Sequence, residues 1–153
     1  MEYWISEHHE SRHHLMVVKF EAAPAEIPDR IGSAFAAVFG YLGRHRVSPA
    51  GPAVGCYEMV GPEHFVVRAG CVVPEPIEAG DGVEPYDLPE GPSLRTLHVG
   101  PYAELPKAYE ALQHHAVQHH LQLDLGMMWE EYLSGPEVPN DQMHTIVHWP
   151  IVG

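Results

Sequence analysis

The chain contains one order of elements twice, and this repeat limits its possible folds more than any other feature. In each half, a β-branched apolar run precedes a segment of helical periodicity, and two more strand-like runs follow. Tyr57 stands shortly before a Gly-Pro-Glu sequence, as does Tyr132 in the second half. Two tandem β-α-β-β units predict an α+β fold with pseudo-twofold symmetry, in which an antiparallel-rich sheet carries two long helices. We expect a ligand groove along the pseudo-dyad, between the helices.

The expected repeats span about residues 2–74 and 93–153 of a single domain, 1–153. In the first half we expect an edge strand at 2–10, a strand at 15–20, a helix at 28–45, and a hairpin of strands at 53–60 and 65–73. In the second half we expect a strand at 94–99, a helix at 105–121, and a closing hairpin of 127–133 with 143–152. Between the halves, about residues 75–92 are rich in Pro, Gly, Glu and Asp, which predicts a linker over the surface.

Charge and composition exclude several classes of protein. The 153 residues contain 21 acidic and eight basic side chains, a formal net charge of −13 with histidine neutral. Such a field repels phosphate backbones and attracts cations, so we expect no direct nucleic-acid partner. No apolar run reaches the roughly 18 residues that a membrane helix needs, and the N-terminal segment does not resemble a signal peptide. Two cysteines without a framework spacing suit a reducing compartment, and we expect a cytoplasmic protein.

The stretch from Trp129 to Pro136 reads as a strand that ends in a turn. Because side chains alternate along a strand, Glu130 and Tyr132 share one face, whereas Trp129, Glu131 and Leu133 share the other. A carboxylate in a largely buried strand is costly without a partner, which suggests a functional role. Alternation alone does not decide which of the two glutamates points inward.

Two motifs of the second half resemble a known family. They are His98-Val-Gly-Pro-Tyr102, which leads into Leu105-Pro-Lys-Ala-Tyr109, and the stretch 129–136. Together with the repeat, they resemble the GyrI-like small-molecule-binding family, which is also the effector-binding domain of multidrug-sensing transcription regulators. The resemblance covers about residues 3–152. It implies an aromatic-lined pocket with an acid at its base, which binds lipophilic and often cationic compounds.

The resemblance assigns the family's acid to Glu130 and its tyrosine to Tyr132, and Tyr57 is similar to the tyrosine of the first half. Burial should raise the pKa of Glu130, and an incoming cation would restore the ionised form. The candidate ligand-binding residues are Glu130, Tyr132, Tyr57, Trp129, Tyr102, Tyr109, Trp149 and His115. For each aromatic residue, core packing is the alternative role. Phe35 and Phe39 recur at helical spacing and are expected in the core.

Three functions follow from this interpretation. The first is a stand-alone protein that binds hydrophobic cations in order to sequester or sense them. No helix-turn-helix segment accompanies the expected domain, so we do not expect the chain to be a regulator by itself. Because some stand-alone members resemble hydrolases that open cyclopropane rings of alkylating natural products, an enzyme is the alternative, with Glu130 as acid or base beside a tyrosine. A protein-interaction module such as a gyrase inhibitor is the third, and homodimerisation along an edge strand stays open.

The histidines and cysteines give weaker indications. His115 and His119 have the i, i+4 spacing of metal ligands on a helix but no Cys, Asp or Glu companion at a motif spacing. They, and the N-terminal histidines (His8, His9, His13 and His14), are expected to be solvated. We therefore expect no metal and no cofactor. Cys56 and Cys71 would lie opposite each other if their hairpin turned at 63–64, but reduced, buried thiols are expected.

Overall fold

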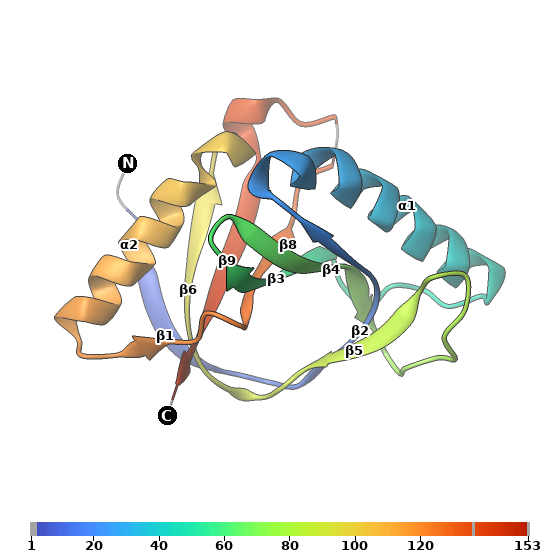
Figure 1. The fold of residues 1–153 in the computed structure, drawn as a ribbon, viewed down its shortest axis with the longest axis horizontal. Helices are drawn as coiled ribbons and strands as arrows, with labels where there is room; N and C mark the ends of the chain where they lie inside the picture. The colour runs from blue at the N-terminus through green and yellow to red at the C-terminus, as the bar shows by residue number, and fades with distance from the viewer. Residues whose placement is uncertain (1–2, 136, 153) are drawn as a thin grey trace.

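One strongly curled antiparallel sheet dominates the computed structural model, which describes residues 3–135 and 137–152 (Figure 1). The sheet order is β1-β6-β9-β8-β3-β4-β2-β5, and the two-residue strand β7 (Gln122–Leu123) pairs with β9. The helices α1 and α2 lie over the same face of this sheet and diverge from each other, as Figure 1 shows. The α+β class predicted from the sequence is confirmed.

The two predicted units are present and meet in the middle of the sheet. The first unit consists of β2 (His13–Ala22), α1 (Ile27–Arg44), β3 (Ala53–Gly61) and β4 (His64–Val73). The second unit consists of β6 (Gly91–Val99), α2 (Leu105–Gln118), β8 (Met128–Tyr132) and β9 (His144–Val152). Because β3 pairs with β8, the corresponding strands of the two units are neighbours at the pseudo-dyad.

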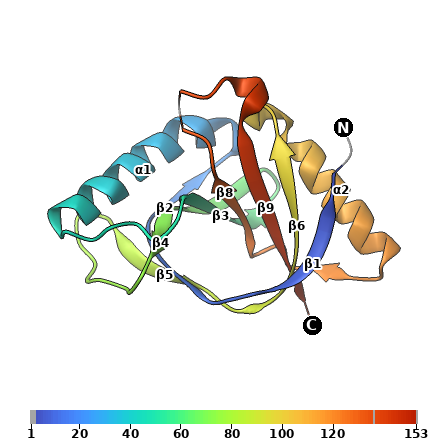
Figure 2. The same cartoon turned by 180° about the vertical axis from the view of Figure 1, so that it is seen from behind.

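The remaining strands, β1 (Ile5–Glu10) and β5 (Glu84–Leu88), tie the two units together. Each leads, after two residues, into the first strand of a unit but pairs with the first strand of the other unit: β1 with β6, and β5 with β2. The result is a long antiparallel ribbon that crosses between the two ends of the sheet (Figure 2). The prediction of a linker over 75–92 is thus wrong at 84–88 and 91–92, which belong to β5 and β6. Pro85 is tolerated because β5 is an edge strand.

Both helices follow the predicted amphipathic pattern. In α1 the buried residues Ala34, Val38 and Leu42 face the sheet, whereas Phe39, expected in the core, is 40% exposed. In α2 the buried residues are Leu105, Ala108, Leu112 and Ala116. This helix ends three residues earlier than predicted, because His120 has a positive φ of 57° and the chain turns there toward β7. Within the described part of the chain, neither helix is long and apolar enough to cross a membrane.

The two cysteines lie on opposite faces of the sheet. The β3–β4 hairpin turns at Pro62 and Glu63, one position earlier than the turn that would align the thiols, and a β-bulge between Met59 and Gly61 shifts the pairing by one further residue. Cys56 therefore pairs with Arg68 and packs on the face away from the helices, whereas Cys71 packs beneath α1. Both are free, and burial raises the pKa of Cys56 to about 12 and of Cys71 to about 11, so both remain thiols at neutral pH.

Candidate functional site

Glu130 lies at the centre of the sheet, on the face that the helices cover. Its strand β8 runs between β3 and β9, and Glu130 pairs with Gly55 on one side and Val147 on the other. The residue is only 6% exposed. A Cβ atom on Gly55 would lie 2.7 Å from Tyr132 Oη and 2.8 Å from Tyr57 Oη. Glycine at this position therefore makes room for two phenol groups above the sheet.

Three tyrosines, from three different elements, surround the carboxylate. Tyr109 of α2 donates a hydrogen bond to Glu130 Oε2 at 2.5 Å, and Tyr132 of β8 donates one to Oε1 at 2.7 Å. The hydroxyl of Tyr57 on β3 is hydrogen-bonded to that of Tyr132. Because the Tyr132 proton points at Glu130, Tyr57 is the donor in that bond. Each carboxylate oxygen thus accepts one phenol hydrogen bond.

Burial governs the protonation of this cluster. It raises the pKa of Glu130, and the hydrogen bonds from Tyr109 and Tyr132 offset only part of that rise. Burial also raises the pKa of the three tyrosines well above the usual value, with the negative charge of Glu130 as the second cause for each. The phenols therefore stay protonated at neutral pH and act as donors.

The carboxylate has donors but no counter-charge. Among residues 3–135 and 137–152, no Lys, Arg or His side chain forms an ion pair with Glu130. A buried carboxylate without a cationic partner is costly to ionise, and hydrogen bonds from neutral phenols supply only part of what water would supply.

Further aromatic rings lead from the surface to this carboxylate. Tyr102, in the short turn before α2, is 42% exposed and packs edge-on against Tyr132, with 5.7 Å between the ring centroids. Phe35 of α1 contacts Tyr132 in the same manner at 5.8 Å. Behind them, Tyr109 packs edge-on against Trp149 at 5.5 Å. These rings occupy the space between the two helices where the sequence predicts a groove.

The sequence matches the family model of the GyrI-like small molecule binding domain over residues 9–151. The chain belongs to the GyrI-like family. A search of curated proteins finds no match.

Solved structures with the fold of this GyrI-like chain include EcmrR, which was solved in a complex with DNA, and a hydrolase. The C-terminal domain of EcmrR superposes with a TM-score of 0.75 at 14% identity, and the match covers 99% of both chains. EcmrR in a DNA complex gives a TM-score of 0.78 at 14% identity over 97% of this chain, which spans only 57% of the EcmrR chain. A hydrolase from Listeria innocua gives 0.66 at 15% identity, covering 97% of this chain and 91% of the other.

A third protein of similar fold was solved with a ligand. SAV2435 bound to tetraphenylphosphonium gives a TM-score of 0.65 at 11% identity, with 100% of this chain and 95% of the other covered. At such identities these likenesses establish the fold alone.

Most of the predicted site residues of this GyrI-like domain come together. Tyr57, Tyr102, Tyr109 and Tyr132 surround or approach Glu130, and Trp149 lies next to Tyr109. Trp129 does not join them. It is on the opposite face of the sheet, where it stacks on His148 at 3.7 Å, as strand alternation requires. Glu131 is on that face too, so Glu130 is the glutamate beneath the helices.

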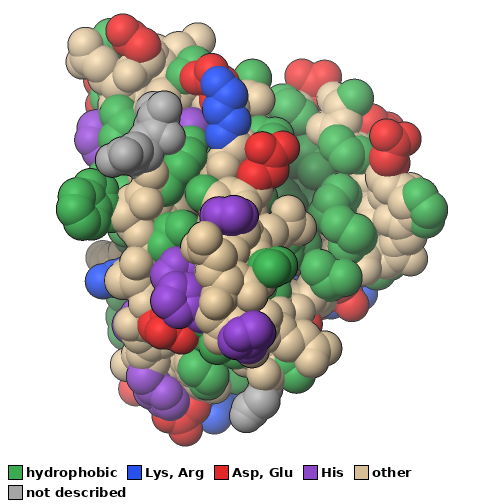
Figure 3. Space-filling model, turned by 90° about the vertical axis from the view of Figure 1, so that its left-hand side faces the viewer, with side chains coloured by type: hydrophobic (Ala, Val, Ile, Leu, Met, Phe, Trp, Pro, Cys, Tyr) green, Lys and Arg blue, Asp and Glu red, His purple; other side chains and the backbone are tan. Residues whose placement is uncertain are grey.

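His115 also lies apart from the tyrosine cluster. It is six residues beyond Tyr109 on α2, which corresponds to about 9 Å along the helix axis. Its ring stacks on that of His119 with centroids 4.2 Å apart. Figure 3 shows several histidine side chains gathered on the side of the molecule where α2 lies.

Sequence reasoning missed two residues that shape the site. Phe35 was expected in the core, but it is half-buried against Tyr132. Gly55 was not among the predicted site residues, although it pairs with Glu130 across the two strands and makes room for the phenols. The pairing register of β3 with β8 would have identified Gly55, and that register is a tertiary property.

Proposed function

We propose that this protein binds hydrophobic cations, with Glu130 as the charge partner and the surrounding tyrosines as the walls of the site. The observation that carries the proposal is the buried carboxylate, which has phenol donors but no cationic partner among the described residues. A ligand that brings positive charge without a tightly bound water shell supplies what Glu130 lacks.

The aromatic surroundings favour the same class of ligand. A cation over the face of a tyrosine or phenylalanine ring is attracted by about 0.5–2 kcal/mol for each ring. Tyr102, Tyr132 and Phe35 lie on the route from the surface to Glu130. The net charge of −13 adds a long-range attraction for cations.

Ligand entry involves movement of side chains. The rings of Phe35 and Tyr102 both pack against Tyr132, whose hydroxyl is hydrogen-bonded to Glu130 Oε1. A ligand that reaches this oxygen displaces the Tyr132 hydroxyl from it and takes the place of the rings between the helices. The partly exposed rings of Phe35 and Tyr102 belong to elements of different repeats, α1 and the turn before α2, so their separation opens the site at the pseudo-dyad.

Tetraphenylphosphonium is a suitable probe, because SAV2435, of the same fold, was solved with it. We expect saturable binding to the wild-type protein by isothermal titration calorimetry. Glu130→Gln should weaken it at least about tenfold, the equivalent of 1.4 kcal/mol. Glu110→Gln, on the exposed side of α2, is the matched control and should leave the dissociation constant unchanged. An unchanged affinity of the Glu130→Gln variant would contradict the proposal.

A hydrolase is the second candidate, favoured by the raised pKa of Glu130 beside phenol donors. A protonated carboxyl can donate a proton to a leaving group, and an ionised one can activate water. A hydrolase from Listeria innocua shares the fold. If this protein is a hydrolase that opens cyclopropane rings, as the family resemblance implies, it should add water to a cyclopropane-bearing alkylator, and mass spectrometry should detect the adduct. Glu130→Gln should abolish the adduct; no adduct from wild-type protein at high concentration would rule this candidate out.

A further inference from the structure

A second cluster of ionisable side chains lies on the face of the sheet away from the helices. At its centre is His148 of β9, which is 1% exposed. Its ring stacks on that of Trp129 with 3.7 Å between centroids and 4° between planes. Glu131 and Glu10 approach its two ring nitrogens, and His8 approaches Glu10. We propose that His8, Glu10 and His148 bind a divalent transition-metal ion, with Zn²⁺ as the best-fitting ion.

The two nitrogens of His148 have different environments. Nε2 is hydrogen-bonded to Glu131 Oε1 at 2.5 Å. Nδ1 lies 2.6 Å from Glu10 Oε1, which is an ion-pair distance, but the contact does not have hydrogen-bond geometry. When Nε2–H is donated to Glu131, the lone pair of Nδ1 faces the Glu10 carboxylate at 2.6 Å, and two electron-rich atoms at this distance need a shared cation. A bound metal ion fills this role.

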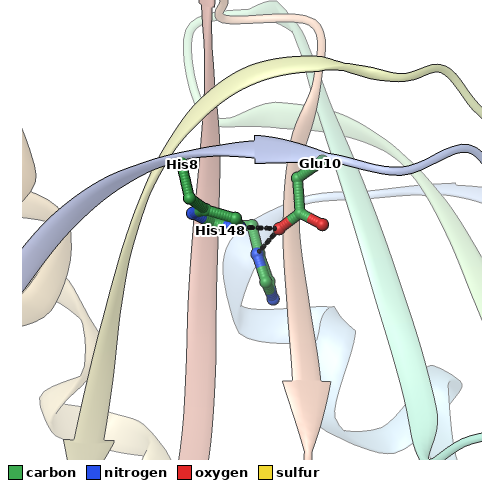
Figure 4. Close-up of side chains that lie close together, drawn as sticks. All are labelled: His8, Glu10 and His148. Atoms are coloured by element: carbon green, nitrogen blue, oxygen red, sulfur yellow. Dashed lines mark hydrogen bonds and ion pairs between the residues drawn. The ribbon is translucent and has the colours of Figure 1, made fainter.

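The three donor groups converge on one point. His8 and Glu10 are two residues apart on β1, so their side chains leave the same face of the strand. One ring nitrogen of His8, one of His148 and a carboxylate oxygen of Glu10 all lie within 4.8 Å of one another. Figure 4 shows the Glu10 carboxylate turned toward both rings.

This donor set suits zinc. Two imidazole nitrogens and one carboxylate oxygen form a common zinc site in which the fourth position is open to water. Around a tetrahedral ion, donor atoms at bond lengths of about 2.0–2.1 Å lie roughly 3.3 Å apart. Glu10 Oε1 is 2.5 Å from His8 Nε2 and 2.6 Å from His148 Nδ1, so less than about 1 Å of expansion accommodates the ion.

Residues around the cluster hold the His148 ring in a fixed orientation, as the residues around a metal site commonly do for its ligands. A metal-binding histidine usually donates its other N–H to a carboxylate, which fixes the tautomer and the ring orientation. Glu131 is in this position for His148: its hydrogen bond at Nε2 leaves Nδ1 directed at Glu10. Trp129 fixes the plane of the ring from one side. Because side chains alternate along β8, Glu130 faces the helices and Glu131 faces His148 on the other side of the sheet.

A cavity next to the cluster provides access. It has a volume of about 150 Å³, and Glu10, His13 and Trp129 are among its lining residues. Asp124 and Glu90 also line it, so an incoming cation meets negative charge. His13 Nε2 is 3.5 Å from Glu10 Oε2, close enough to contact a water in the fourth position.

The test uses the full chain after treatment with a chelator, at pH 7.5, with Co²⁺ and Zn²⁺ as probes. One equivalent of Co²⁺ should produce the intense visible absorption of a four-coordinate ion, and Zn²⁺ should displace it. His8→Gln and Glu10→Gln should each weaken Zn²⁺ binding at least about 100-fold, the upper range found for residues that merely orient metal ligands. Zn²⁺ should raise the melting temperature of the wild type and not that of the two variants.

Two controls separate this site from chelation by other histidines. His9→Gln changes the next residue of β1, whose side chain is 67% exposed, and His115→Gln changes the stacked histidine pair of α2. Neither should alter the affinity. If wild-type protein binds no stoichiometric ion, or if His115→Gln abolishes binding while His8→Gln does not, the proposal is wrong. Circular dichroism should show that both test variants fold. Binding of tetraphenylphosphonium should persist in them, because the two sites lie on opposite faces of the sheet.

Discussion

Tyr109 of α2 donates a hydrogen bond to Glu130 of β8, with 2.5 Å between the phenol and carboxylate oxygens. The bond connects the helix of the second repeat to the centre of the sheet. It also stabilises the ionised form of a carboxyl group that burial pushes toward the neutral form. Cation binding as proposed depends on the balance between these two effects.

Removal of the Tyr109 hydroxyl should destabilise the fold. A hydrogen bond to a charged group contributes about 1.5–3 kcal/mol, so Tyr109→Phe should lower the free energy of unfolding by an amount in this range at pH 8. Tyr86→Phe is the matched control, since the only hydrogen-bond partner of its hydroxyl among the described residues is the sulfur of Met127 at 3.9 Å, and it should cost less than about 0.5 kcal/mol. Urea unfolding measures both. Equal losses in the two variants would show that the hydroxyl of Tyr109 has no special role.

Affinity for cations should fall as the solution becomes acidic. Burial raises the pKa of Glu130, so the carboxyl group takes up its proton at a higher pH than an exposed glutamate does. A cation binds the ionised form, and its dissociation constant should therefore increase as pH falls toward and below that pKa. Titrations of tetraphenylphosphonium between pH 8 and pH 5 test this, and Glu130→Gln should remove the dependence. A steep dependence that persists in Glu130→Gln would assign it to another group.

The stability of the fold should change with pH in the opposite direction to the cation affinity, and Glu130 should again be the cause. The pKa of Glu130 is higher in the folded than in the unfolded protein, so the unfolded state loses its proton first as pH rises above about 4.5. Ionisation therefore destabilises the native state increasingly until pH exceeds the folded-state pKa. Glu130→Gln should raise the melting temperature relative to wild type at pH 7, and the gain should vanish near pH 4. A variant less stable than wild type at pH 7 would mean that the phenol hydrogen bonds outweigh the burial.

Gly55 should not tolerate a side chain. The Cβ of Gly55→Ala would meet the hydroxyls of Tyr132 and Tyr57 at 2.7 and 2.8 Å, and overpacking of this kind costs about 1–3 kcal/mol. Displacement of the phenols should also weaken cation binding. Gly32→Ala in α1 has no atom within 4 Å of the new Cβ and should stabilise the helix by about 0.5–1 kcal/mol. Thermal unfolding of both variants checks the contrast, which a neutral Gly55→Ala would contradict.

The repeated order of elements in the sequence predicted the two units, both helices and the pseudo-dyad, because periodicity is a local property. It did not predict β5, since Pro85 and the acidic, glycine-rich surroundings favour a turn, and only the pairing with β2 makes this segment a strand. Alternation placed Glu130 and Tyr132 on one face, and the family resemblance selected that face as the inner one. The same alternation places Trp129 on the opposite face from Glu130, and its prediction as a ligand-binding residue did not take this into account.

The cluster of His8, Glu10 and His148 could not be predicted from the sequence, for a different reason. His8 and Glu10 are neighbours on β1, but His148 comes from the last strand. A search for metal ligands at short spacings, such as His115 and His119, does not find a site that the curled sheet assembles from the two ends of the chain. The ribbon of β1–β2 and β5–β6 is the element that brings Glu10 to His148.

The most direct measurement compares a cation with a neutral molecule of similar shape. Tetraphenylphosphonium and triphenylphosphine oxide present similar aromatic surfaces, but only the first is charged. The wild-type protein should prefer the cation at least about tenfold at pH 8, a difference of 1.4 kcal/mol. In Glu130→Gln this preference should disappear while binding of the neutral molecule persists. An equal preference for the cation in both proteins would contradict the assignment of Glu130 as the charge partner.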